Sequence, residues 1–294
     1  MNELPEQTLF ESTALRRNFN HLAFGLGIAL GIFFLYQLMG GGLAGIMLFT
    51  GYKEWLWLAQ GIGQVVFMLF PAILVMKYSP LGHRGLLRYE GQTSKIQWIA
   101  GIIGILAFQL FADSFTTLQE QLIPQSIMPL YENMKQQMES MYATLLGGGG
   151  GVNIIKGLVI GAIIPALSEE VLFRGIMQRS LEQVWSPLRA ILWTSVIFGV
   201  IHLNPADIVS LVFIGGYLGV LAYSTKSLAL PITVHFLNNA IAVVALNLTD
   251  TNSINQPDGA PIWIAGVLCT SGLAAACVAA MVVWRGRVEN EISN

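Results

Sequence analysis

Apolar runs that match the thickness of a lipid bilayer recur along the whole chain. A helix rises about 1.5 Å per residue and the hydrocarbon core is about 30 Å thick, so about 20 mainly apolar residues cross a membrane. Hydropathy delimits eight such segments, separated by polar connections. The predicted segments are residues 20–39, 55–76, 96–118, 152–175, 188–203, 207–224, 228–247 and 261–284. The fifth and sixth are short and closely joined, so they could form a tight hairpin that does not fully span the membrane.

The composition agrees with a chain that lives in lipid. Only 11% of the residues are charged and the mean hydropathy is +0.62, whereas soluble domains carry about 25% charged residues. We therefore predict an all-α, polytopic membrane protein, a bundle of about eight transmembrane helices with the lipid bilayer as its surroundings. The net charge of −2 gives no reason to expect a nucleic-acid partner, and nothing in the sequence indicates an oligomeric state.

The basic residues predict how the bundle is oriented. With the N-terminus inside, twelve Lys and Arg residues fall in the inner loops and tails, and only Lys53, Lys135 and Lys156 fall outside. Positive charge favours the cytoplasmic side of a membrane, so both termini are predicted to be cytoplasmic. The first apolar run is interpreted as a retained span, because a cleaved signal peptide has a shorter apolar core and a small-residue cleavage site.

By motif content the chain divides into three parts, which we expect to form one structural domain. Residues 1–150 hold the first three helices and an outer loop, residues 151–250 carry most of the polar groups inside apolar segments, and residues 251–294 hold the last helix and a cytoplasmic tail. The third part contains no polar motif. The middle part is therefore the predicted site of chemistry.

The outer loop contains a second kind of pattern. Its apolar residues follow the 3/4 spacing of an amphipathic helix, and they are Ile127, Leu130, Met134, Met138, Met141 and Leu145. The five glycines from Gly147 to Gly151 follow directly and predict a flexible joint. This amphipathic helix could lie on the membrane surface, or it could act as a lid over the core.

Three charged residues, Glu169, Glu170 and Arg174, lie inside the fourth apolar segment. An ionised side chain near the bilayer centre costs about 2.5–3.5 kcal/mol, so such groups pair, face a cavity or do chemistry. Residues i and i+4 share a helix face, which predicts a pair between Glu170 and Arg174. Glu169 is rotated by about 100° and remains available. The alternative is that all three are structural charges near the inner surface.

Two of the four histidines lie in apolar segments. His202 ends the run that begins at Phe198, and His235 shares a helix face with Asn239. A lone buried histidine is most often a hydrogen-bonded core residue, but together with the glutamates these residues suit hydrolysis. Glu169 could take a proton from water, and His202 could position that water. His235 and Asn239 could stabilise the oxyanion that forms.

A metal offers an alternative use of the same residues. Glu169, His202 and His235 could hold Zn²⁺ or another divalent ion in a His₂Glu set with one position left for water. The His-Glu-x-x-His signature of zinc proteases is absent from the sequence. The metal version therefore stays open beside the metal-free one.

The spacing along the chain tests whether these side chains can meet. Glu169 lies 17 residues before Ser186, and His202 lies 16 residues after it. A hairpin that turns near Ser186 brings both to one level, provided that the fourth helix continues to about Leu181. His235 does not reach that level from spacing alone.

These motifs resemble those of the CAAX protease and bacteriocin-processing family of intramembrane endopeptidases, which are related to type II CAAX prenyl proteases. The family pattern is Glu-Glu-x-x-x-Arg, then Phe-x-x-x-His, then His-x-x-x-Asn, on three helices. Here these motifs occupy residues 169–174, 198–202 and 235–239, and the resemblance covers roughly 152–247. It implies a bundle of eight membrane helices that hydrolyses a peptide bond in a membrane-associated peptide or protein.

The resemblance also implies roles for the residues. The catalytic positions are matched by Glu169, His202, His235 and Asn239, and the supporting positions by Glu170, Arg174 and Phe198. The first two match the positions that activate water, and the next two match those that stabilise the oxyanion. Family members are commonly called metalloproteases, although a metal-free glutamate mechanism is also argued. Some members confer bacteriocin immunity or act as scaffolds, so a non-catalytic immunity or scaffold protein is the alternative. A proton-coupled transporter is a third, because buried carboxylates and histidines also form proton relays.

Overall fold

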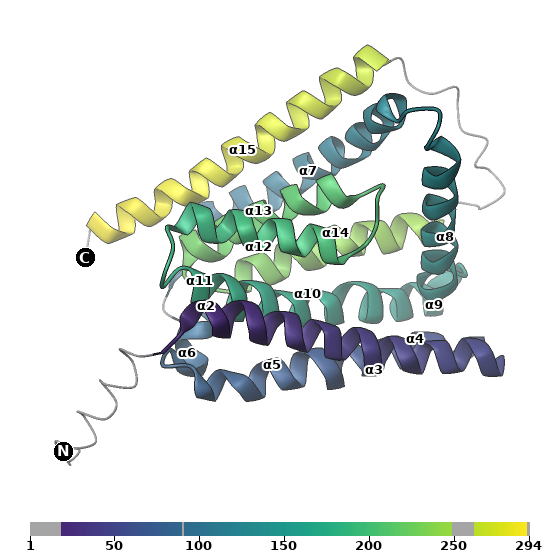
Figure 1. The fold of residues 1–294 in the computed structure, drawn as a ribbon. Helices are drawn as coiled ribbons and strands as arrows, with labels where there is room; N and C mark the ends of the chain where they lie inside the picture. The colour runs from purple at the N-terminus through teal and green to yellow at the C-terminus, as the bar shows by residue number, and fades with distance from the viewer. Residues whose placement is uncertain (1–18, 90, 249–261, 293–294) are drawn as a thin grey trace.

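The computed structural model describes residues 19–89, 91–248 and 262–292. Within these ranges all regular structure is helical and there is no strand. Seven helices are long and apolar enough to cross a membrane, and most of them run side by side along the long axis of the bundle (Figure 1). The predicted all-α, polytopic membrane bundle is confirmed.

The helices on both sides of the central one are mostly long and continuous. The first span joins α2 (His21–Ala23), η1 (Phe24–Ile28) and α3 (Ala29–Thr50); the second joins η2 (Lys53–Trp55), α4 (Leu56–Gln64), η3 (Val65–Leu69), α5 (Phe70–Val75) and η4 (Met76–Tyr78). After the short α6 (Gly82–Leu86) come α7 (Lys95–Leu122) and α8 (Met128–Leu146), and the chain ends with α12 (Pro187–Ile201), α13 (Ile208–Thr225), α14 (Ala229–Leu248) and α15 (Ile262–Ile292).

The fourth long helix, Gly150–Leu181, runs through the middle of the bundle. It consists of α9 (Gly150–Gly157), η5 (Leu158–Ile163), α10 (Ile164–Glu169), η6 (Glu170–Gln178) and α11 (Arg179–Leu181). It continues to Leu181, six residues beyond the predicted end at 175, as the hairpin argument required. Its segments η5 and η6 are π-helical, and η5 ends just before Pro165, whose missing N–H interrupts the α-helical ladder.

The fifth predicted span is too short to cross a bilayer by itself. Helix α12 has 15 residues, which correspond to about 22 Å of rise, against a hydrocarbon core of about 30 Å. It forms a hairpin with α13, and this hairpin turns before the end of the bundle that α8 covers (Figure 1). The described residues therefore hold seven long helices and one short one, and the short helix belongs to the tight hairpin that the sequence allowed for the fifth and sixth segments.

The other predicted bounds agree within a few residues at most ends, but the first helix is longer than expected. It runs to Thr50 instead of ending at residue 39: the glycines from Gly40 onward do not break the helix, and Gly40 packs against α4. A Cβ added to Gly63 of α4 would lie only 2.9 Å from the Cα of Gly40 in α3. Small residues at a helix crossing let two backbones approach closely.

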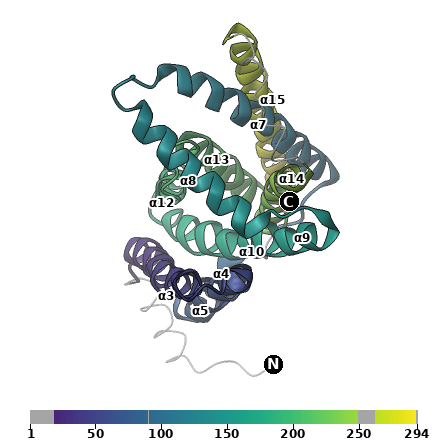
Figure 2. The ribbon, with the colours of Figure 1, turned by 90° about the vertical axis from the view of Figure 1, so that its right-hand side faces the viewer.

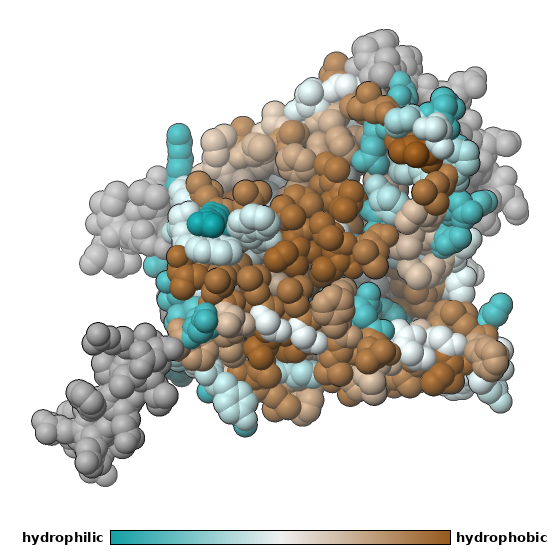
Figure 3. Space-filling view, in the orientation of Figure 1, coloured by the Kyte–Doolittle hydropathy of each residue, from teal (hydrophilic) through white to brown (hydrophobic). Residues whose placement is uncertain are grey.

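Helix α8 lies across one end of the bundle, roughly at right angles to the long helices (Figure 2). The helix predicted in the loop from residue 119 to 151 is therefore confirmed. Apolar side chains cover much of the flank of the molecule, and polar ones gather toward its two ends (Figure 3). This distribution fits a protein surrounded by lipid. The termini lie outside the described residues, so their cytoplasmic location stays a prediction.

The glycine run after α8 makes a turn that glycine favours. Gly148, Gly149 and Gly150 have φ values of 117°, 65° and 74°, which disfavour residues with a Cβ. The side chain of Asn247 on α14 holds this turn, because it donates to the carbonyl of Leu146 at 2.8 Å and accepts from the Gly149 N–H at 3.1 Å. The joint is therefore tied to α14.

Candidate active site

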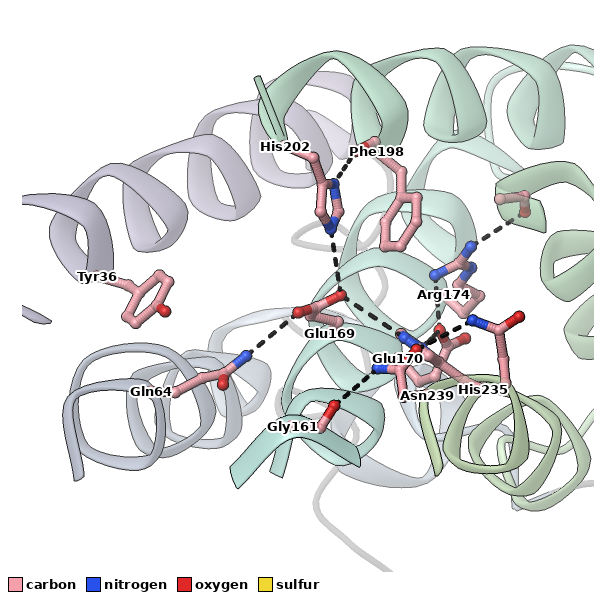
Figure 4. Close-up of polar contacts among 12 residues, drawn as sticks. Tyr36, Gln64, Gly161, Glu169, Glu170, Arg174, Phe198, His202, His235 and Asn239 are labelled. Atoms are coloured by element: carbon pink, nitrogen blue, oxygen red, sulfur yellow. Dashed lines mark hydrogen bonds and ion pairs between the residues drawn. The ribbon is translucent and has the colours of Figure 1, made fainter. Parts of the chain in front are cut away.

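Glu169 ends α10 in the middle of the bundle and faces two histidines from other helices (Figure 4). Its Oε2 atom lies 3.8 Å from Nε2 of His202 and 3.9 Å from Nε2 of His235. These distances are longer than a direct hydrogen bond but suit one bridging water. The Glu169 side chain is 14% exposed. The fold thus brings together the three residues that the motifs singled out.

His202 is held by the end of its own helix. It follows α12 directly, and its Nδ1 atom lies 2.5 Å from the carbonyl oxygen of Phe198. A carbonyl can only accept, so Nδ1 carries the proton and donates it. The other nitrogen, Nε2, then presents a lone pair toward Glu169 when the ring is neutral. The short α12–α13 hairpin is what sets His202 at this level.

His235 is fixed in a similar way by the second glutamate. Its Nδ1 atom lies 2.8 Å from Oε1 of Glu170, so with Glu170 ionised Nδ1–H donates and Nε2 points toward Glu169. Two imidazole nitrogens and one carboxylate oxygen therefore converge on a single space. Acceptors that converge in this way call for a donor or a cation between them.

The predicted pair between Glu170 and Arg174 is confirmed. Arg174 Nη1 donates to Glu170 Oε1 at 2.7 Å, and both side chains are 0% exposed. Arg174 Nη2 also donates to the carbonyl of Gly215 at 3.0 Å, and one turn later Gln178 donates to the carbonyl of Gly219 at 3.0 Å. This ladder fastens η6 to α13, and it satisfies much of the charge that burial would otherwise penalise.

Phe198 lies at the centre of the aromatic and charged groups. The Arg174 guanidinium is 4.6 Å from the centre of its ring, and the rings of Phe173, His202 and His235 lie 5.2, 4.6 and 6.1 Å away. Such contacts are each worth about 0.5–1.5 kcal/mol beyond simple burial. Phe198 thereby orients both histidines and covers the buried pair.

Asn239 forms a hydrogen bond with a backbone carbonyl that has no helical donor because a proline lies four residues later. Pro165 has no N–H, so the carbonyl of Gly161, four residues earlier, lacks its helical donor. The Asn239 amide donates to this carbonyl at 3.1 Å, and its oxygen accepts from Asn238 at 3.1 Å. An amide group carries two N–H donors, so Asn239 has a second hydrogen for a substrate oxygen.

The N-terminal helices contribute residues that the sequence analysis missed. Gln64 on α4 donates from Nε2 to Glu169 Oε1 at 3.2 Å, and Gln60, one turn earlier, donates to the hydroxyl of Tyr36 on α3. A signal was present, because Gln60 and Gln64 share one face of an apolar span.

Helix α8 also approaches the site, at the turn of the α12–α13 hairpin. Burial raises the pKa of the Tyr142 phenol on α8, and the negative charges of Asp207 and, more weakly, Glu169 add to this effect, against a hydrogen bond with Asn204. Burial likewise raises the pKa of the Asp207 carboxyl, although Asn204 donates to it at 2.7 Å and Lys135 lies near. The α8 side chains are thus within electrostatic reach of the proposed catalytic carboxylate.

The predicted metal set was tested against the geometry of its donors. Among the described residues, no group of three or more His, Cys, Asp or Glu side chains has the arrangement needed to hold a metal ion. Nδ1 of each histidine ring has an oxygen partner, as the outer nitrogen of a zinc-binding histidine usually does. The ligand arrangement itself does not fit, so we derive no chemical step through a metal.

The fold and the site define a polytopic membrane protein with an ionisable cluster enclosed by its helices. Residues 151–241 match the family model described as "Type II CAAX prenyl endopeptidase Rce1-like", which confirms the family resemblance that the three motifs indicate. The matched residues include all three motifs, and the activity that this family model describes is that of a CAAX-type endopeptidase. No significant match was found among curated proteins or among solved structures.

Proposed function

We propose that this protein is an intramembrane endopeptidase in which Glu169 activates water to hydrolyse a peptide bond of a membrane-associated protein or peptide. The observation that carries the proposal is the position of Glu169 Oε2, at 3.8 and 3.9 Å from the Nε2 atoms of His202 and His235. Both separations exceed a direct hydrogen bond, so a water molecule held by these three atoms is the proposed nucleophile. The match to a CAAX-type endopeptidase family supports the same reaction class.

In the first step the ionised Glu169 takes a proton from the water. The water oxygen forms a bond to the carbonyl carbon of the substrate, and the carbonyl electron pair moves onto its oxygen. His202 orients the attacking molecule by accepting its second hydrogen at Nε2. The arrangement needs no serine or cysteine nucleophile.

The resulting oxyanion needs hydrogen-bond donors. His235 donates from Nε2 when its ring is protonated at both nitrogens, and Glu170 stabilises that imidazolium by accepting from Nδ1. The second N–H of Asn239 is the other donor. Glu169 then passes its proton to the amide nitrogen, the carbon–nitrogen bond breaks, and a carboxyl group and an amine leave.

The test uses purified protein in proteoliposomes and a fluorogenic peptide that ends in a farnesylated Cys-a-a-X sequence. Glu169→Gln and His202→Gln should each lower turnover by about 10²-fold or more, as expected for a lost acid–base group. His83→Gln is the matched control, since His83 is exposed and contacts only the carbonyl of Ile73 among the hydrogen bonds observed for it. Thermal unfolding should stay close to that of the parent protein in all three variants.

Wild-type turnover by Glu169→Gln would contradict the proposal and favour the scaffold or immunity alternative. The same peptide without its farnesyl group measures whether the lipid matters. Metal analysis of the purified protein, with turnover measured before and after a strong chelator, decides the cofactor. The proposal expects turnover to survive chelation, and complete loss that Zn²⁺ restores would replace the metal-free route by a metal-assisted one.

A further inference from the structure

The carboxylate of Glu169 accepts a hydrogen bond from a residue that lies outside the matched region 151–241. Gln64 Nε2 donates to Oε1 at 3.2 Å, while Oε2 is the oxygen that faces both histidines. Gln64 is 3% exposed and lies on the opposite side of the carboxylate from the imidazoles (Figure 4). The Gln64 amide, inside an apolar span, thus binds one oxygen of the Glu169 carboxylate and leaves the other to face the histidines.

Helix α4 reaches this position because glycines let it approach two neighbours. A Cβ added to Gly61 would lie 3.1 Å from Ile160 and 3.4 Å from Ile164 of the central helix. On another face of α4, a Cβ on Gly63 would lie 2.9 Å from the Cα of Gly40. Side chains at Gly61 and Gly63 would push α4 outward. Gln64 follows Gly63 directly, so the close packing delivers its amide to Glu169.

A second contact braces this arrangement one turn away. Gln60 donates to the Tyr36 hydroxyl, and the Tyr36 ring fits where Gly40 lacks a side chain, since a Cβ there would lie 2.9 Å from the ring. Tyr36 and Gln64 both approach Glu169 from this side (Figure 4). Helices α3 and α4 therefore present one continuous polar edge to the site.

We propose that Gln64 is a positioning residue for the general base, which holds Oε1 so that Oε2 alone faces the water and the histidines. The inference rests on the proposed function, in which Glu169 is that base. The last torsion of a glutamate side chain is broad, so the plane of a free carboxylate is loosely held. A donor on one oxygen fixes the orientation of that plane. Hydrogen bonds to charged groups change equilibria by about tenfold or more.

The variant Gln64→Met keeps the length of the side chain and removes the donor. With the farnesylated Cys-a-a-X peptide it should lower kcat by about tenfold and leave KM within about twofold, because Gln64 acts through Glu169 and not on the substrate. Gln64→Glu should lower kcat further, because it brings a second carboxylate to Glu169.

The matched control is Gln97→Met on α7. Gln97 is 1% exposed and donates to the carbonyl of Val283 at 3.1 Å, so it is an equally buried, hydrogen-bonded glutamine on another helix. A merely structural role for Gln64 would make the two methionine variants alike in unfolding and in kinetics. The proposal expects stability losses in both variants, the larger one in Gln97→Met because Gln97 also accepts from the Ser94 N–H at 3.0 Å in the cap of α7, and a fall in kcat for Gln64→Met alone.

A second measurement needs no substrate. Dicyclohexylcarbodiimide reacts with protonated carboxyl groups in apolar surroundings, and mass spectrometry locates the adduct. Labelling of Glu169 should be about tenfold faster in Gln64→Met than in the parent protein at the same pH, because Oε1 no longer has the Gln64 amide as its hydrogen-bond partner. Gln97→Met should label like the parent.

The outcomes separate the two proposals. Parental kcat and parental labelling in Gln64→Met, with Glu169→Gln inactive, would overturn the positioning role and leave the proposed function intact. Full activity of Glu169→Gln would overturn the proposed function. In that case faster labelling of Gln64→Met would still establish that Gln64 holds the carboxylate, and parental labelling would refute it.

Discussion

The two sides of the Glu169 carboxylate are built from different chemistry. On the Oε2 side, helices of the matched region supply two imidazoles and, behind them, the ion pair of Glu170 and Arg174, both 0% exposed. On the Oε1 side, α4 supplies a neutral amide from Gln64. Charges in an apolar setting must be compensated within one connected set. The neutral side can orient the carboxylate without adding a charge that needs a partner.

The first prediction concerns the charged side, where we expect the largest effect on stability. Arg174→Leu leaves the Glu170 carboxylate buried without its partner, which should lower the free energy of unfolding by about 3–5 kcal/mol. The double variant Glu170→Leu/Arg174→Leu should recover part of this loss, because no lone charge remains. Chemical unfolding in detergent, followed by circular dichroism, measures both.

An exposed pair gives the control for this experiment. Lys135 and Glu120 form an ion pair in which the side chains are 28% and 34% exposed. Lys135→Leu should therefore cost no more than about 1 kcal/mol. Equal losses in the free energy of unfolding for Arg174→Leu and Lys135→Leu would show that burial does not determine how much stability is lost when an ion pair is broken.

The second prediction tests how the charged side is held together. Phe198→Leu removes the ring that contacts Arg174 and both histidines, so it should destabilise the protein by about 2 kcal/mol and slow peptide cleavage. Phe34→Leu is the control, because Phe34 is 63% exposed on the flank, and it should change stability by about 0.5 kcal/mol or less. A stable but slow Phe198→Leu protein would assign the ring to orientation alone.

The third prediction tests the neutral side without touching any charged residue. Gly63→Ala places a Cβ against the backbone of Gly40, so α3 and α4 must separate, at a cost of about 1–2 kcal/mol. Cleavage should slow, because Gln64 moves with its helix. Gly45→Ala has open space around the new Cβ and should be neutral or slightly stabilising. Parental kinetics for Gly63→Ala would separate the packing of α4 from the chemistry.

The smallest effect is expected at the glycine joint after α8, which belongs to neither side of the Glu169 carboxylate. Gly149→Ala puts a Cβ on a residue with φ of 65° and ψ of 167°, a conformation nearly restricted to glycine, which should cost at least about 1 kcal/mol, whereas Gly151→Ala adds a Cβ in open space within α9 and should not. If α8 acts as a lid, Gly149→Ala should also change turnover. Unchanged turnover in Gly149→Ala would remove the lid hypothesis and leave α8 as a surface helix.

The charged side could be predicted from the sequence and the neutral side could not, for a physical reason. Glu170 and Arg174 are four residues apart, so helix geometry alone pairs them. His202 reaches Glu169 because a hairpin sets the register. Gln64 reaches Glu169 across 105 residues of chain through the close packing of glycines on α3 and α4, which no local spacing encodes. The helical hydrogen bond that Pro165 cannot donate likewise explains the contact between Asn239 and the Gly161 carbonyl, but only after α14 has been placed beside the central helix.

The contacts of α14 with the central helix also fix how far one can slide along the other. His235 forms a hydrogen bond with Glu170, and one turn later Asn239 donates a hydrogen bond to the carbonyl of Gly161. These two hydrogen bonds reach residues that lie nine positions apart on the central helix, so a shift of either helix by one residue would break both. Pro165, by leaving the Gly161 carbonyl without a helical donor, thus helps to fix the register of α14 on the central helix against sliding along their common axis.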